Sequence, residues 1–174
     1  MKTIYRTALP ALAAVALVAF ASHGGSNQKT GSLQQQVQGT WTMVSNVLDQ
    51  GGNKTEPYGT GAKGSVVLTK DGRVMLIITR ADVPKFASNN RTTGTPEENK
   101  AAVAGSIAYF GTYTVNDADK MLVMHLEGST YPNLAGRAQT RTIDLLTADE
   151  FRNTNPAAMM PTPHQRSAVE TSVS

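Results

Sequence analysis

The chain consists mainly of short β-type runs separated by turn clusters, and this succession restricts its possible folds more than any other feature. The clearest pair is 65–69 and 73–80, two β-branched runs on either side of Lys70-Asp71-Gly72. An Asp-Gly step supplies the positive φ that a tight hairpin needs. Similar runs predict further strands at 41–49, 112–115, 121–127, 139–146 and 151–154. Seven or eight short strands joined mostly by short turns predict a mainly β, antiparallel barrel or sandwich.

One segment has a helical pattern instead. Thr95 can cap a helix in which Pro96 is the first residue and Glu98 completes a capping box. An apolar stripe at i, i+4 and i+7 follows, formed by Val103, Ile107 and Phe110. The pattern predicts one α-helix over about 96–109, ended by Gly111.

The first 21 residues predict a cleaved signal peptide. They combine a basic start, an apolar run at 8–21 and small residues at Ala19 and Ala21. The alternative is an uncleaved membrane anchor, but the apolar run has only 14 residues, whereas a spanning helix needs about 20. We therefore expect an exported protein, periplasmic or secreted, with no membrane span after cleavage.

Three regions are expected along the chain: the signal peptide at 1–21, a flexible lead-in at 22–32 and a barrel domain at 33–174. The end of that domain, 155–174, is interrupted by prolines and could form a loose tail. Within it, only 166–174 has the pattern of a strand that could close the barrel.

Charge and cysteine content exclude several classes of function. The formal net charge is +3, but the first 21 residues hold two basic and no acidic residues, which leaves 14 basic against 13 acidic. A near-neutral domain lacks the clustered Lys and Arg that nucleic-acid binding requires. Because the chain has no cysteine, an exported domain must be stable through its core alone, without disulfides.

Seven short motifs, in order along the chain, resemble those of the lipocalin-like domain family. They are Gly39-Thr40-Trp41, Thr55-Glu56-Pro57-Tyr58-Gly59, Pro84-Lys85-Phe86-Ala87-Ser88, Gly94-Thr95-Pro96-Glu97-Glu98, Ala108-Tyr109-Phe110-Gly111-Thr112-Tyr113, His125-Leu126-Glu127-Gly128-Ser129 and Tyr131-Pro132-Asn133. The resemblance implies a calycin-type barrel of about seven or eight strands with the Gly-x-Trp motif at its closed end. It implies no shared catalytic residues.

The sequence lacks the common catalytic and cofactor motifs. There is no nucleophile elbow, phosphate loop, dinucleotide fingerprint or His-Glu-x-x-His sequence. His23 and His164 lie outside the predicted strands, so His125 is the one histidine expected inside the fold. We expect no metal site and no cofactor.

His125 and Glu127 share a strand face with Val123, opposite the more apolar face of Leu122, Met124 and Leu126. Two interpretations follow. Either the apolar face points inward and His125 lies in solvent, or His125 and Glu127 face the barrel interior as a proton-transfer pair.

Two arginines lie on predominantly apolar strand faces, Arg80 with Val74, Leu76 and Ile78, and Arg141 with Ile143 and Leu145. Each is either a rim residue that reaches water or a cation that binds a ligand carboxylate or enolate. Tyr109, Tyr113 and Tyr131 are the available phenols, although packing is the commoner role for such rings.

These residues support three hypotheses. The first is a binding module that holds a small hydrophobic molecule in the barrel, with Arg80, Tyr109, Tyr113, His125, Glu127 and Arg141 as its polar contacts. The second is a cofactor-free isomerase or cyclase in the same pocket, with His125 or Tyr113 as the catalytic residue. The third is a structural domain with a filled core.

Overall fold

The computed structural model describes residues 31–50, 53–155 and 165–172, and the last range in backbone only. Residues 1–21, predicted as a signal peptide, lie outside the described residues, as does most of the expected lead-in. The strands are β1 (Gly39–Gln50), β2 (Asn53–Thr55), β3 (Lys63–Leu68), β4 (Arg73–Thr79), β5 (Ser106–Asn116), β6 (Met121–Ser129), β7 (Ala138–Leu146), β8 (Glu150–Asn155) and β9 (Gln165–Ser172). The helices are α1 (Leu33–Gln36), α2 (Pro96–Ala104) and the 3-10 helix η1 (Pro132–Leu134).

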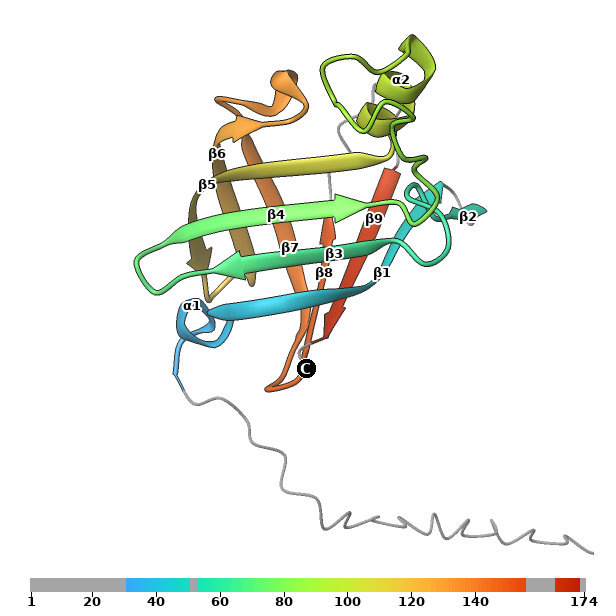
Figure 1. Cartoon of the computed structure of the whole chain (residues 1–174). Helices are drawn as coiled ribbons and strands as arrows, with labels where there is room; N and C mark the ends of the chain where they lie inside the picture. Colours follow the sequence, from blue (N-terminus) through green and yellow to red (C-terminus); the bar gives the residue numbers. More distant parts are fainter. Residues whose placement is uncertain (1–30, 51–52, 156–164, 173–174) are drawn as a thin grey trace, which may run out of the picture.

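The sheet closes on itself as an antiparallel meander (Figure 1). From β3 to β9 each strand pairs with the next, β3 also pairs with β1, and β9 returns to pair with β1. The short β2 lies against the end of β1. The predicted mainly β, antiparallel barrel with one longer helix is therefore confirmed. The sequence left open whether 166–174 closes the barrel or belongs to a loose tail, and the structure has the strand β9 at Gln165–Ser172, paired with β1.

The predicted helix is shorter than expected. It begins at Pro96 but ends at Ala104, because Ile107 and Phe110 belong to β5, where they pair with Ile78 and Met75 of β4. The i, i+4, i+7 spacing of apolar residues favoured a helix, but the backbone hydrogen bonds between β4 and β5 stabilise a strand at these residues instead. No helix in the described part of the chain is long and apolar enough to cross a membrane.

The start of α2 follows its sequence signature. The Thr95 hydroxyl accepts a hydrogen bond from the Glu98 amide, and the Glu98 carboxylate accepts one from the Thr95 amide at 2.8 Å. The same carboxylate accepts the Ala87 amide at 2.8 Å, which ties the preceding loop to the helix. These backbone bonds, first that of Ala87, lower the pKa of Glu98.

One end of the barrel is closed by α1 and by Trp41. The Trp41 indole is fully buried, donates to the Val37 carbonyl at 2.7 Å and packs on the Phe151 ring, 5.4 Å between centroids. The Leu33 amide at the start of α1 donates to Asp117 in the β5–β6 turn. This places the Gly-x-Trp motif at the closed end, as the resemblance implied.

The alternation of side chains along the strands sets the lumen. In β6, Leu122, Met124 and Leu126 are nearly fully buried, whereas His125 and Glu127 on the opposite face are exposed. The face of β6 that points into the barrel is thus the apolar one. At the bulge between Phe110 and Gly111 the β5 and β6 backbones lie close together, so a Cβ on Gly111 would collide with the His125 carbonyl.

Candidate functional site

A cavity of about 300 Å³ lies inside the ring of strands. This volume is at the lower end of the range of small-molecule sites, about 300–1,000 Å³. Most of its wall is apolar, formed by Pro57, Val66, Leu68, Leu76, Ile78, Ile107, Leu122, Met124, Leu134 and Phe151. The polar side chains in the wall are Asn46, Tyr58, Tyr109, Tyr131, Gln139, Arg141, Asn153 and Asn155.

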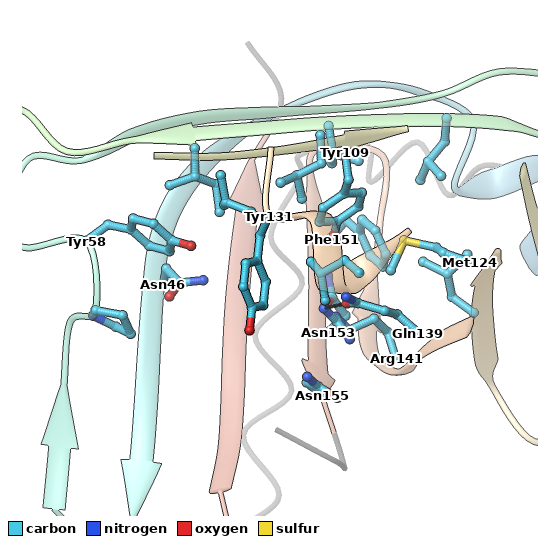
Figure 2. Close-up of a pocket in the computed structure, with 18 residues that line it drawn as sticks. Asn46, Tyr58, Tyr109, Met124, Tyr131, Gln139, Arg141, Phe151, Asn153 and Asn155 are labelled. Carbon is cyan, nitrogen blue, oxygen red and sulfur yellow. Dashed lines mark hydrogen bonds between the residues drawn. The ribbon is translucent and has the colours of Figure 1, made fainter. Parts of the chain in front are cut away.

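These polar side chains gather on opposite sides of the cavity (Figure 2). Gln139 and Arg141 from β7 converge with Asn153 from β8 on one side, and Asn46 lies beside Tyr58 on the other. Tyr131 projects between the two groups and is 50% exposed. The site therefore combines an apolar wall with two separate sets of hydrogen-bonding groups.

Two phenols in the wall stay protonated at neutral pH. Burial raises the pKa of Tyr109, and the Arg141 guanidinium beside it acts in the opposite direction. Burial also raises the pKa of Tyr58, to which the nearby Tyr109 adds. Because an ordinary tyrosine titrates near pH 10, both hydroxyls are neutral donors that can bind a ligand oxygen.

Arg141 is held in place by its own strand. Its guanidinium donates to the Gln139 side-chain oxygen at 2.7 Å and to the Thr140 carbonyl at 3.0 Å. Period-2 alternation along β7 puts Arg141 on the same face as the buried Gln139 and Ile143. Of the two arginines predicted as ligand contacts, Arg141 lies in the cavity wall.

Arg80 lies elsewhere. It follows the last residue of β4, and its guanidinium binds the Asp82 carboxylate through two hydrogen bonds of 2.7 and 2.8 Å. This pairing, first through the hydrogen bond, raises the pKa of Arg80 and lowers that of Asp82. Arg80, predicted as a ligand contact, is therefore not among the residues that line the cavity, and its charge is paired with Asp82.

His125 and Glu127 also lie outside the cavity. Both are on the outer face of β6, and the Glu127 carboxylate pairs with Arg73 of β4 at 2.5 and 2.9 Å. The hydrogen bond from Arg73 lowers the pKa of Glu127. The interpretation of His125 and Glu127 as an interior proton-transfer pair is wrong, because the apolar face of β6 is the one that fills the interior.

Tyr113 is buried at the closed end and does not line the cavity. Its hydroxyl donates to the Thr69 carbonyl at 2.9 Å in the β3–β4 turn. Burial raises its pKa, with a smaller contribution from Asp71. The candidate catalytic phenol thus holds a hairpin turn to β5.

We predict that Tyr113→Phe lowers the free energy of unfolding by about 1 kcal/mol, the typical value of one hydrogen bond, and leaves ligand binding unchanged. Urea unfolding and a binding titration on the same preparation test this. If the folded Tyr113→Phe protein bound the ligand more weakly, Tyr113 would contribute to the binding site after all, and the prediction would be wrong.

Five polar wall residues were not predicted: Asn46, Tyr58, Gln139, Asn153 and Asn155. Tyr58 lies in the loop between β2 and β3, where no alternation of side chains along a strand indicates which residues point inward. Asn153 was detectable in principle, because it shares a strand face with Phe151, whose burial the sequence suggests. Arg152 and Thr154, on the other face, are polar as well, so the residue pattern of β8 does not indicate which face points inward.

Among the described residues, no group of three or more His, Asp or Glu side chains lies close enough together to bind a metal ion. The fold places the chain in the class of small up-and-down β-barrels, here with a cavity in the lumen. The family model of the lipocalin-like domain matches residues 38–173, and the chain belongs to this lipocalin-like domain family. Among curated proteins, the sequence search finds no match.

Proposed function

We propose that the barrel binds one small, largely apolar molecule in its lumen. The observation that carries this proposal is the cavity of about 300 Å³, with ten apolar side chains in its wall and polar side chains at opposite sides. Apolar walls provide affinity by removing ligand surface from water, and a few placed polar groups orient the ligand. The lipocalin-like fold is consistent with this role.

The two other hypotheses have less support. A filled core would leave no cavity of this size. A cofactor-free isomerase or cyclase needs a group that moves a proton, and the two candidates for it, His125 and Tyr113, lie away from the cavity wall. No observation on the remaining wall residues favours catalysis over binding.

Fluorescence titration with N-phenyl-1-naphthylamine, a neutral apolar probe, tests the proposal. We expect the emission to rise and shift to the blue with a stoichiometry of one probe per chain. The control is the same titration after unfolding in urea, which removes the cavity. An unsaturable signal, or none, with the folded protein would contradict the proposal.

We also propose that the protein acts outside the cytoplasm, on the basis of the sequence of residues 1–21. Expression of the full chain in a Gram-negative host is predicted to yield a mature protein that begins at Ser22. Intact-mass measurement of the periplasmic fraction checks the cleavage site, and Ala21→Arg is expected to block it, because signal peptidase requires small residues there. Full-length protein retained in the cytoplasm would contradict export.

A further inference from the structure

The charge inside the cavity is unbalanced, and this indicates the chemistry of the ligand. The described residues that line the cavity include one charged side chain, Arg141, and no carboxylate. The ion pairs among described residues are Arg73–Glu127, Arg80–Asp82 and Arg152–Glu150, so none of them engages Arg141. A cation in a largely apolar wall is costly unless an anion meets it.

Hydrogen-bonding groups surround this cation. Two of the five guanidinium N–H groups of Arg141 bind Gln139 and Thr140, which leaves others directed toward Tyr109 and the cavity. The neighbouring Asn153 is only 7% exposed, and within the described part of the chain its side-chain amide has no hydrogen-bond partner. Figure 2 shows Asn153, Gln139 and Arg141 on the same side of the cavity. The amide is therefore available to hydrogen-bond a molecule that occupies the cavity.

We propose that the ligand carries one carboxylate, which binds Arg141 and the Asn153 amide while its apolar body lies against Leu122 and Met124. This inference rests on the proposed function, since it assumes that the lumen binds a molecule. The planar guanidinium fork matches the two oxygens of a carboxylate, and such charge-assisted hydrogen bonds are stronger than neutral ones. The hydroxyl of Tyr109, protonated at neutral pH, is a further donor beside the same group.

The test compares two competitors of equal chain length, octanoate and octan-1-ol, that displace N-phenyl-1-naphthylamine at pH 7. We expect the wild-type protein to bind octanoate about tenfold or more tightly than octan-1-ol. Arg141→Met should weaken octanoate about tenfold and leave octan-1-ol within about twofold. Arg73→Met is the control matched for net charge, because Arg73 is on the outer surface, and it should leave both affinities unchanged.

The outcomes separate the two proposals. If neither the probe nor the competitors bind, the proposed function fails. If the probe binds but octanoate and octan-1-ol compete equally, and Arg141→Met changes neither, the carboxylate inference is overturned while lumen binding stands. Should Arg141→Met fail to fold, Asn153→Leu decides: we expect it to lower the preference for octanoate about threefold or more, and an unchanged preference overturns the inference.

Discussion

Leu76→Trp is expected to weaken binding of N-phenyl-1-naphthylamine at least about 100-fold, because an indole in the lumen occupies the space that the ligand needs. Leu76 is on the inner face of β4 and lines the cavity. The cavity accepts the added volume, so the free energy of unfolding should change by less than about 1.5 kcal/mol. Fluorescence titration and thermal unfolding of the same protein measure both quantities.

The neighbouring residue on the same strand provides the matched control. Ile77 points outward and is 51% exposed. Ile77→Trp adds the same side chain to the outer surface, so the probe should bind as it does to the wild type. A folded Leu76→Trp protein that binds with wild-type affinity would place the site outside the lumen.

Trp41→Ala is expected to lower the free energy of unfolding by roughly 3–5 kcal/mol, the usual cost of removing a large buried aromatic ring. The substitution removes the contact with Phe151 and leaves the Val37 carbonyl at the closed end without its indole donor. Because many domains have only about 5–15 kcal/mol of stability, the variant should be close to unfolding at room temperature. Urea unfolding followed by circular dichroism gives the value.

Two variants make this prediction specific. Val44→Ala, on the same strand but 61% exposed, should change stability by less than about 0.5 kcal/mol. Trp41→Phe keeps an aromatic ring and loses the indole N–H, so it should fold with an intermediate stability and an unchanged affinity for the probe. Equal stabilities for Trp41→Ala and Val44→Ala would show that Trp41 does not hold the closed end.

The strands were predictable because their local patterns agree with the pairing. The Asp71-Gly72 turn has the expected positive φ at Gly72, 83°, and joins β3 to β4 in register. The end of α2 was not predictable, since Ile107 and Phe110 fit both a helical stripe and a strand. Only the pairing of β5 with β4 and β6, which brings together distant segments, selects the strand.

The site was predictable only in part. Tyr109 and Arg141 are where the sequence suggested, because each lies on a strand face with buried neighbours. His125 was a candidate because its imidazole can transfer protons near neutral pH. The packing of Leu122, Met124 and Leu126 in the interior places His125 on the outer face of β6. Asn153 lies near Arg141 because of the register in which β7 and β8 pair across a bulge. No local sequence pattern predicts that register.

Methyl NMR of the methionines tests the central claim, binding inside the lumen, most directly. Met124 lines the cavity and is 3% exposed, whereas Met75 is on the outer surface and is 52% exposed. With methyl-labelled methionine and assignment by Met→Leu variants, saturating N-phenyl-1-naphthylamine is predicted to shift the Met124 signal along the same binding curve as the fluorescence, with Met75 unchanged. A shift of Met75 alone, or an unperturbed Met124 at saturation, would contradict binding in the lumen.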